Sequence, residues 1–453
     1  MSRLLAVRVL ERVERSRAYA DLALHHALSQ SSLVSADRAL CTELVYGTLR
    51  WRGRIDFLLS TLLASKFDEL EPLVASALRI GAYQILFSDR IPVTAAVDQA
   101  VRCTRALGAD RATGLVNAVL RRLAREHTSV ELPKLDREPL EHLVHALSLP
   151  RWIAERWLEQ FGPEGAAELA RTSNAAPPLT VRANRTRTSV ADLLSELRTR
   201  FPDAHACRFA PHGLVLGRRG EPGRDPAFLA GRFTVQDEAS QLVVDLLDPQ
   251  AGDRVLDTCA APGTKATAIA ERVGEAGHLL ALDRHTRRLQ LVARDARRLG
   301  LRHIQTLTRD ATRSLTDLCE NHGAAGGGLF DRVLVDAPCT GLGVLRRNPD
   351  AKWRVRPQDS LELAGIQGTI LRRAAAVLRV GGRLVYSTCT LLPAENEELV
   401  MGFLKDTPNF RLLQKAAAPE LLSPLLDRHG FVRCLPHVHD SDGFFAAALE
   451  RVQ

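Results

Sequence analysis

Several sequence features are rare or missing, and each absence argues against one class of protein. No uninterrupted apolar stretch reaches the length of a membrane-spanning helix, which argues against an integral membrane protein. The eight cysteines include no CxxC pair and match no zinc-binding spacing, so we expect free thiols and no metal site. Charged residues interrupt the first eleven residues, which therefore lack the apolar core of a secretory signal. These shortages predict a cytoplasmic protein without a membrane partner.

Lysine is scarce and arginine abundant: six of the 61 basic residues are lysines and 55 are arginines. With 53 acidic residues, the formal net charge is +8. Arginine forms paired hydrogen bonds with phosphates and stacks on bases, which suits an RNA partner. A genome whose codons favour arginine would explain the same ratio with solvated side chains. The positive sign nevertheless favours a polyanionic partner.

Hydrophobic periodicity divides the chain into three predicted domains. Residues 1–130 carry apolar residues at helical spacing and predict an all-helical bundle, which either serves only to dock or is an RNA-binding arm. Residues 131–235 are interrupted by prolines and predict a small α+β unit, with strand-like segments at 179–184 and 213–216 around a helix at 190–198. Residues 236–453 alternate strands and helices, which is typical of a doubly wound, Rossmann-like α/β domain. The predicted strands of this third domain are 254–257, 278–283, 304–307, 332–336, 383–387 and 444–449, and the glycines at 326–328 are expected in a loop.

The first predicted strand of the α/β domain leads into a loop of small residues. The loop and the helix start after it comprise Cys259, Ala260, Ala261, Pro262, Gly263, Thr264 and Lys265. Small residues let a ligand approach the N-terminus of the following helix. Asp283 ends the next strand, twenty residues after Gly263, where this fold places a carboxylate for ribose hydroxyls, and Asp310 could meet an adenine edge.

The loop matches neither GxGxxG nor the phosphate-binding GxxxxGK[ST] pattern. A small nucleoside cofactor without phosphates fits better, and S-adenosylmethionine is the obvious candidate. The alternative is an ordinary tight turn between a strand and a helix, with acidic residues nearby by chance.

Two cysteines, fifty residues apart, each follow a predicted buried strand. Asp336 ends one strand three residues before Cys339, and Cys389 directly follows the other. Because the carboxyl ends of parallel strands meet at one crevice, both thiols can reach a single substrate. A thiolate that adds to C6 of cytosine makes C5 nucleophilic, and a carboxylic acid near N3 stabilises the adduct. Two cysteines can divide attack and release, although Cys259, Cys339 and Cys389 could instead gather around a metal ion.

These motifs resemble the Sun family of RNA cytosine-C5 methyltransferases, and within it the bacterial enzymes that act on 16S ribosomal RNA. The resemblance covers nearly the whole chain. The first 130 residues resemble a NusB-type helical RNA-binding domain through the segments 43–47 and 116–121. The catalytic half carries the specific motifs, which lie at residues 236–240, 257–265, 336–343, 346–350, 387–390 and 442–445.

The resemblance implies a role for each predicted site residue. Cys389 is the nucleophile, Cys339 assists product release, and Lys265 lies near the target base. Residues 259–265 hold the methionine and ribose end of S-adenosylmethionine, with Asp283 at the ribose and Asp310 at the adenine. Asp336 lies beside both cofactor and base. The resemblance also implies a monomeric enzyme whose partner is 16S rRNA. It assigns RNA contacts to Arg346, Arg347 and Asn348, although these residues could equally form a solvated surface loop.

The sequence departs from the family pattern without losing a catalytic group. Thr264 stands where a second glycine is usual, so its Cβ is expected to shift the loop slightly. Thr340 replaces the commoner serine after Cys339, and alanines fill 446–448. Two rival functions remain: C5 methylation of transfer RNA, another RNA or DNA, and a non-catalytic RNA-binding or ribosome-assembly factor. DNA enzymes of this chemistry attack with the cysteine of the Pro-Cys motif, which here is Cys339.

Overall fold

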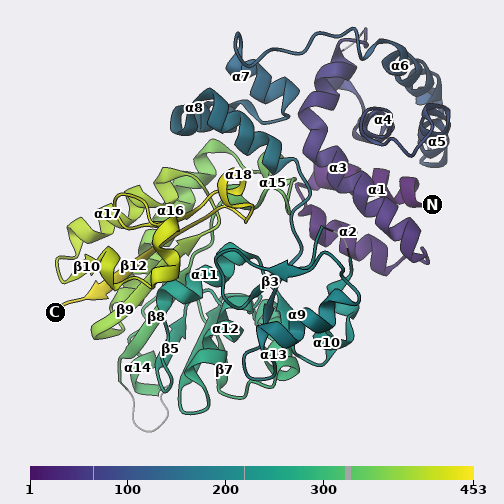
Figure 1. The fold of residues 1–453 in the computed structure, drawn as a ribbon. Helices are drawn as coiled ribbons and strands as arrows, with labels where there is room; N and C mark the ends of the chain where they lie inside the picture. Colours follow the sequence, from purple (N-terminus) through teal and green to yellow (C-terminus); the bar gives the residue numbers. More distant parts are fainter. Residues whose placement is uncertain (65, 219, 322–327) are drawn as a thin grey trace. The chain divides into compact units, whose positions relative to one another are not determined.

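The computed structural model describes residues 1–64, 66–218, 220–321 and 328–453, so that two of the three glycines of the predicted loop at 326–328 lie outside the described residues. The chain divides into two compact units (Figure 1). The first comprises residues 1–175 and 345–356, and the second comprises 176–344 and 357–453. The first unit therefore includes residues 131–175, which the sequence pattern grouped with the small α+β unit. It also includes a short segment that follows the Cys339 motif.

The first unit is built from helices. Leu44, Ile55 and Leu78 lie in its core without solvent exposure, as the helical spacing of apolar residues predicts. Pro92 directly precedes a helix, where its fixed φ angle costs nothing. The helices are α1 (Ser2–Ser16), α2 (Ala20–Ser29), α3 (Ser35–Ser60), α4 (Pro72–Phe87), α5 (Val93–Ala106), α6 (Thr113–Glu126), α7 (Pro139–Glu141), α8 (Arg151–Ser173) and α15 (Ala351–Arg354).

Helix α8 shows why residues 131–175 were difficult to predict. Pro163 lies inside the helix, directly after Gly162, whose φ angle of 69° breaks the helical path. Proline is tolerated there because it begins the second helical segment, where its missing N–H would have no partner. Pro163, which predicts the end of a helix when only the sequence is known, therefore lies at a kink between two helical segments of α8.

A small antiparallel sheet opens the second unit. Its strand order is β2-β3-β1-β4, with Val181 of β1 opposite Leu214 on one side and Val235 on the other. Ser189 accepts a hydrogen bond from the Asp192 N–H and so caps the helix that follows β1. The elements are β1 (Thr180–Ala183), α9 (Val190–Arg198), β2 (His205–Ala206), β3 (Gly213–Val215), α10 (Pro226–Leu229) and β4 (Phe233–Val235).

The main sheet has the order β10-β12-β9-β8-β5-β6-β7, and β11 pairs with β12. The five strands from β9 to β7 are parallel, whereas β12 runs antiparallel to β9. The order reverses between β5 and β8, which is the point where such sheets bind ligands. The strands are β5 (Arg254–Asp257), β6 (His278–Asp283), β7 (Ile304–Thr308), β8 (Phe330–Asp336), β9 (Leu378–Thr388), β10 (Phe410–Leu412), β11 (Val432–Cys434) and β12 (Phe444–Arg451).

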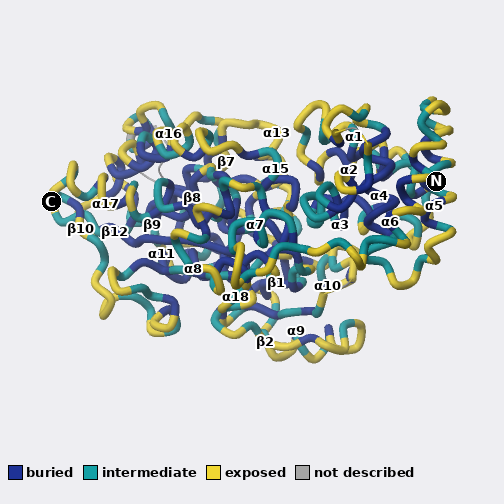
Figure 2. The backbone as a smooth tube through the Cα atoms, turned by 90° about the horizontal axis from the view of Figure 1, so that it is seen from above, coloured by how far each residue is buried: buried dark blue, intermediate teal, exposed yellow. Residues whose placement is uncertain are grey.

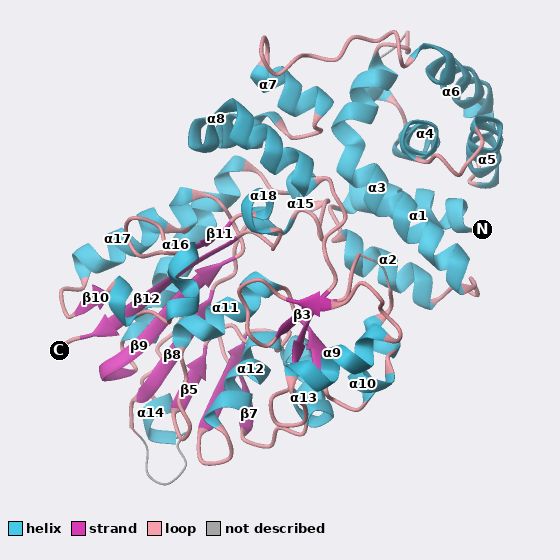
Figure 3. Cartoon of the chain, viewed as in Figure 1, coloured by secondary structure: helices cyan, strands magenta, loops and turns pink. Residues whose placement is uncertain are grey.

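Helices cover both faces of this sheet (Figure 3). Successive strand residues point to opposite faces, so that Val255 packs with the cluster under α11, α12 and α13, and Leu256 with the cluster under α16 and α17. The buried stretches of β8 and β9 are dark blue in Figure 2. The helices are α11 (Glu238–Leu247), α12 (Thr264–Val273), α13 (Thr286–Leu299), α14 (Leu318–Asn321), α16 (Pro357–Ala375), α17 (Glu397–Asp406) and α18 (Pro436–His439).

The predicted fold class is confirmed: a helical bundle, a small α+β sheet and a Rossmann-like α/β domain follow one another. All six predicted strands of the α/β domain are present, whereas the three-residue strands β10 and β11 were too short to show a periodic pattern. Within the described ranges, no helix combines the length and apolar character that crossing a membrane would need.

Candidate active site

The two cysteines lie side by side at the carboxyl ends of β8 and β9. These strands are parallel neighbours, with Asp336 opposite Ser387, so the loops that follow them leave the sheet together. The sulfur atoms of Cys339 and Cys389 are 3.3 Å apart, and the Cys389 N–H points to the Cys339 sulfur at 3.4 Å. Both side chains are partly exposed, so a ligand entering the crevice can reach either sulfur.

The environment of Cys339 favours the protonated thiol. Its hydrogen bond with Cys389 is the main cause of a pKa raised well above the usual value, and burial acts in the same direction. The nearby Glu395 carboxylate also opposes a second negative charge. Cys339 therefore keeps its proton at neutral pH and can donate a hydrogen bond to a sulfur 3.3 Å away.

Asp336 is held by a cation and a hydroxyl group. The Lys265 ammonium lies 2.7 Å from its Oδ2 atom, and Ser387 donates to its Oδ1 atom at 2.8 Å. Lys265 is only 7% exposed and lies 4.9 Å from the centre of the Phe444 ring. The structure therefore brings together four residues that the sequence singled out: Lys265, Asp336, Cys339 and Cys389.

A buried carboxylate that the sequence interpretation missed connects the two cysteine loops. Glu395 is fully buried and accepts hydrogen bonds from the Thr340 N–H at 3.0 Å and the Thr340 hydroxyl at 2.7 Å. Because the Thr340 hydroxyl donates its one hydrogen to Glu395, it accepts a hydrogen bond from the Thr390 hydroxyl, 2.7 Å away. Each threonine directly follows one of the cysteines. The hydroxyl residue after each cysteine was the available sequence signal.

Further side chains complete this network. Gln367 donates to the Glu395 carboxylate and to the Pro338 carbonyl, both at 2.9 Å, and Ser360 donates to Glu395 at 3.2 Å. Burial raises the pKa of Glu395, and these donors oppose that rise. The loop that carries Cys339 is therefore anchored on both sides of the cysteine, at Pro338 and at Thr340.

The predicted cofactor loop joins β5 to helix α12. Gly263 has a φ angle of 116°, and a Cβ there would lie 3.0 Å from the Val292 backbone, so both conformation and space require glycine. Thr264 is the first residue of α12 and lies outside the positive-φ region. The positive φ angle of this turn therefore falls on Gly263, and the expected slight shift of the loop by the Thr264 Cβ stays a prediction.

Three acidic residues surround the crevice beside this loop. Asp257 is buried, and its Oδ2 atom has no hydrogen-bond partner among the described residues. Burial and the charge of Asp336 raise the pKa of Asp257 to about 8. Asp283 is 6% exposed and accepts from the His285 N–H at 2.8 Å. Asp310 is exposed, and hydrogen bonds from the Thr312 N–H and hydroxyl lower its pKa.

This donor set fits a nucleoside cofactor such as S-adenosylmethionine. The unpartnered Oδ2 atom of the buried Asp257 carboxyl at the end of β5 is free to bond to a ligand, and Asp283 and Asp310 offer acceptors for hydroxyl and amino groups at the ends of the next two strands. Gly263, Ala260 and Ala261 keep side chains out of the approach to α12. The burial of Cys259 raises its pKa and so makes it a poor nucleophile at neutral pH.

The three residues predicted to contact RNA differ in exposure. Asn348 is exposed and Arg347 partly exposed, but the Arg346 side chain is only 1% exposed. Its backbone carbonyl accepts from Arg50 at 2.8 Å, within the first unit. The prediction that Arg346 contacts RNA is therefore corrected, because its side chain is packed inside that unit. Nowhere in the described ranges do three His, Cys, Asp or Glu side chains gather as a metal site requires.

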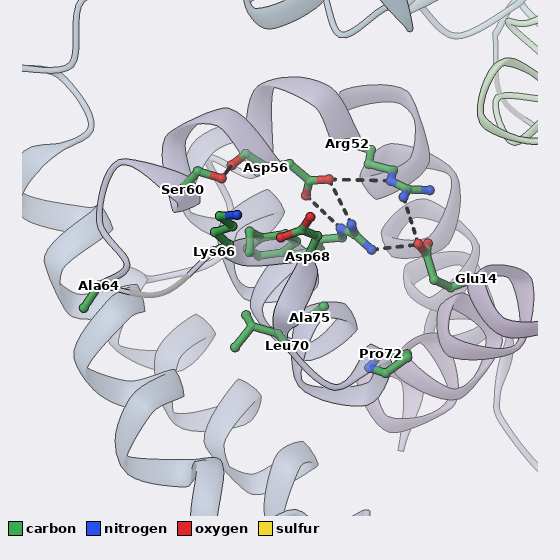
Figure 4. A pocket seen from close by; sticks show the side chains of 12 residues that line it. Glu14, Arg52, Asp56, Ser60, Ala64, Lys66, Asp68, Leu70, Pro72 and Ala75 are labelled. Carbon is green, nitrogen blue, oxygen red and sulfur yellow. Dashed lines mark hydrogen bonds and ion pairs between the residues drawn. The ribbon is translucent and has the colours of Figure 1, made fainter.

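The first unit contains a pocket of about 680 Å³ between α1, α3 and α4 (Figure 4). Four of the charged side chains that line it, Glu14, Arg52, Asp56 and Arg79, form a network of ion pairs. Arg79 is bound by Asp56 at 2.8 Å and by Glu14 at 3.3 Å, and Arg52 pairs with Glu14 at 2.8 Å. None of the lining residues belongs to the predicted site. We therefore assign the catalytic chemistry to the cysteine crevice and a structural role to this ion-pair network.

Comparisons with known proteins show which family the chain resembles. Three family models match: the NusB family over residues 1–125, the RsmF/B-like ferredoxin-like domain over 149–221, and 16S rRNA methyltransferase RsmB/F over 244–450. The probable ribosomal RNA small subunit methyltransferase B of Bacillus subtilis is 35% identical over 451 residues, 99% of this chain and 98% of the relative.

A second relative and a solved structure extend the similarity over the full length. The ribosomal RNA small subunit methyltransferase B of Pseudomonas putida is 36% identical over 450 residues, covering 99% of this chain and 98% of its own. The crystal structure of PH0851 has a TM-score of 0.79 and 26% identity, covering 100% of this chain and 99% of that one. The similarity therefore spans the helical unit, the small sheet and the cysteine crevice.

Proposed function

Since the chain belongs to the RsmB/F family of 16S rRNA methyltransferases, with S-adenosylmethionine as its cofactor, we propose that it methylates C5 of a cytosine in that RNA. The observation that carries the proposal is the 3.3 Å separation of the Cys339 and Cys389 sulfurs beside the Asp336–Lys265 pair. One sulfur can attack the base while the other stays within reach of the same carbon atoms. A monomer meeting its RNA in the cytoplasm suffices for this chemistry.

The first step is attack on the cytosine ring. The Cys389 thiolate forms a bond to C6, and the electrons of the C5–C6 double bond move toward C5 and N3. Asp336, held by Lys265 and Ser387, is positioned to hydrogen-bond at the N3 edge when it carries a proton. S-adenosylmethionine supplies an electrophilic methyl group when bound. C5 would take this methyl group with the electron pair gained in the attack, and S-adenosylhomocysteine would leave with the electrons of the broken carbon–sulfur bond.

The second step restores the aromatic ring. A base removes the proton that remains on C5, the electrons of that C–H bond re-form the C5–C6 double bond, and Cys389 leaves as a thiolate. We assign assistance in this release to Cys339, because its raised pKa keeps the thiol protonated and the thiol can donate a hydrogen bond to the departing Cys389 thiolate, 3.3 Å away. The loop from Cys259 to Lys265, with Asp257, Asp283 and Asp310, would hold the cofactor. Arg347 and Asn348 remain proposed RNA contacts.

Separate replacement of the two cysteines tests these roles. Each variant is mixed with 16S rRNA and S-adenosylmethionine, and protein–RNA adducts that survive denaturing electrophoresis are measured. We expect Cys339→Ala to accumulate adduct, because release fails after the bond to C6 has formed. We expect Cys389→Ala to form none. Adduct in Cys389→Ala and none in Cys339→Ala would overturn the assignment and support the mechanism of the Pro-Cys nucleophile.

Bisulfite sequencing of ribosomal RNA tests the substrate. RNA from a deletion strain should lose 5-methylcytosine at a small-subunit position, and the wild-type gene should restore it. Loss of the mark in transfer RNA alone would favour the alternative substrate. An unchanged mark in every RNA, together with no methyl transfer by the purified protein, would favour a non-catalytic assembly factor that binds RNA through its NusB-like helices.

A further inference from the structure

One segment of the second unit has a high local positive charge. Residues 284–302, which include α13, carry seven basic residues and one acidic residue, a net charge of +6, whereas the whole chain of 453 residues carries +8. The charged residues of this segment are Arg284, Arg287, Arg288, Arg294, Asp295, Arg297, Arg298 and Arg302. Helix α16, of the same unit, has two acidic and two basic residues and no net charge.

The arginines and the apolar residues of α13 lie on different faces. Leu289, Val292, Ala296 and Leu299 recur every three or four residues and are buried against the main sheet. The opposite face carries Arg287 and Arg294, which are exposed, as is Arg297 beside them. Arg287 and Arg294 are seven residues apart and therefore about 10 Å apart along the helix.

Most of these arginines form no ion pair, unlike other cations of the protein, although the charge of Arg284 contributes to the lowered pKa of Asp310. Arg298 pairs with Asp295 at 3.2 Å, and Arg288 lies 3.6 Å from Asp283. No carboxylate within 4.0 Å pairs with Arg284, Arg287 or Arg294 in the part of the chain that the structure describes. An exposed row of unpaired guanidinium groups attracts a polyanion and offers paired hydrogen bonds to phosphate oxygens.

Helix α13 also connects the cofactor loop to the small sheet. Near its start, Arg288 donates to the Ala261 carbonyl at 2.8 Å. Near its end, Arg298 donates to the carbonyls of Phe228 and Phe233 at 2.8 and 2.9 Å. The exposed face therefore runs from beside the cofactor loop toward the ferredoxin-like sheet within one rigidly bonded unit.

We propose that this face, defined by Arg284, Arg287, Arg294 and Arg297, binds the phosphate backbone of the substrate RNA beside the active site. The proposal rests on the RNA substrate proposed above and adds the surface that holds it. Backbone contacts position a nucleic acid without reading its sequence. The target cytosine is recognised elsewhere, and α13 supplies affinity that depends strongly on salt.

The test compares two double variants of the full-length protein. Arg287→Gln/Arg294→Gln removes two charges from α13, and Arg372→Gln/Arg373→Gln removes two exposed charges from α16 as a matched control. Binding of deproteinised 16S rRNA transcript is measured by filter retention between about 50 and 300 mM KCl. S-adenosylmethionine binding by calorimetry shows in each variant that the fold and cofactor loop are intact.

We expect the α13 variant to bind RNA roughly tenfold more weakly at low salt. We also expect the slope of log affinity against log salt to flatten by about two, one for each phosphate contact. The control should keep the wild-type slope, because α16 carries no net charge. Wild-type affinity and slope in the α13 variant, or the same loss in the α16 variant, would overturn the proposal. If α13 binds RNA but the protein forms no 5-methylcytosine in that RNA, the proposed function is refuted and the RNA-binding role of α13 still stands.

Discussion

At the scale of single residues, Glu395 connects the loop that carries Cys339 to the loop that carries Cys389. Its carboxylate receives both donors of Thr340, and Thr340 in turn receives the hydroxyl of Thr390. The residues that directly follow Cys339 and Cys389 are thus joined through one buried acid. A substitution in this hydrogen-bond network keeps both sulfur atoms but alters their orientation. It can therefore distinguish a positioning role from a direct role in the reaction.

Replacement of Thr340 tests this role. Thr340→Val keeps the shape but removes a hydrogen bond to a buried carboxylate, a loss of about 1.5–3 kcal/mol. We expect product release to slow roughly tenfold and the covalent adduct to accumulate, because the Cys339 loop loses its anchor. Thr340→Ser keeps the hydroxyl and should release product within about twofold of wild type in single-turnover assays. Equal release rates in Thr340→Val and Thr340→Ser would contradict the positioning role.

Asp257 makes stability depend on pH. Burial raises its pKa to about 8 in the folded protein, above the ordinary value of 3.8, so the folded state binds more protons than the unfolded state between these values. Stability from this group is therefore present at low pH and is lost as pH rises toward 8. We expect Asp257→Asn to remove this loss, so that its Tm relative to wild type increases from pH 5 to pH 8. A difference in Tm that stays constant across this range would show that Asp257 is ionised throughout.

At the scale of elements, a buried ion pair fixes helix α12 to strand β1. Arg182 of β1 lies 2.7 Å from Glu271 of α12, donates to the Thr264 carbonyl at 2.7 Å, and is 4% exposed. Because Thr264 follows Gly263, this arginine connects the small sheet to the start of the helix that bears the cofactor loop. The small sheet therefore helps to position the helix that carries the cofactor loop.

Removal of one partner of this pair should be costly. Arg182→Met leaves the Glu271 charge buried without its partner, and we expect the free energy of unfolding to fall by about 3–5 kcal/mol. The double variant Arg182→Met/Glu271→Gln should recover part of this loss, since no uncompensated charge remains. Urea unfolding followed by circular dichroism measures both. An Arg182→Met variant as stable as wild type would show that Glu271 is solvated or protonated in the fold.

At the scale of the whole molecule, the chain passes between the two units three times. Residues 345–356 leave the second unit soon after Cys339, fold with the first unit and return. Within the first unit, Lys352 donates to the Arg50 carbonyl at 2.8 Å and to Asn174 at 3.0 Å, and the Trp353 indole donates to the Leu49 carbonyl at 2.7 Å. The helical unit is therefore incomplete without a segment that belongs, in sequence, to the catalytic half.

Lys352→Met tests the importance of this segment. The variant leaves two buried acceptors without a donor, at a cost of about 1–3 kcal/mol each. We expect the calorimetric transition of the helical unit to move down by several degrees, while Lys405→Met, at an exposed position of α17, leaves it unchanged. An unchanged transition in Lys352→Met would mean that residues 345–356 do not stabilise the first unit.

The fold could be predicted from sequence where a pattern repeats within one element. The helical spacing of residues 1–130 and the apolar runs at 254–257 and 332–336 specify their elements locally, since each buries its own face. The boundary of the small α+β unit is harder to predict, because proline and glycine at 162–163 resemble a break when the helices that pack around them are not known. The positions of the cysteines and of Asp336 at strand ends already pointed to one crevice.

The sequence by itself determined the family, the Rossmann-like order of strands and the set of residues that can carry the chemistry, because motifs and periodicity are local properties of the chain. Only the tertiary structure decided which distant groups touch. It placed the sulfurs of Cys339 and Cys389 3.3 Å apart, joined their loops through Glu395, and buried Arg346. It also turned the arginines of α13 outward. These outcomes depend on how separate elements pack, and no segment of the sequence carries that information alone.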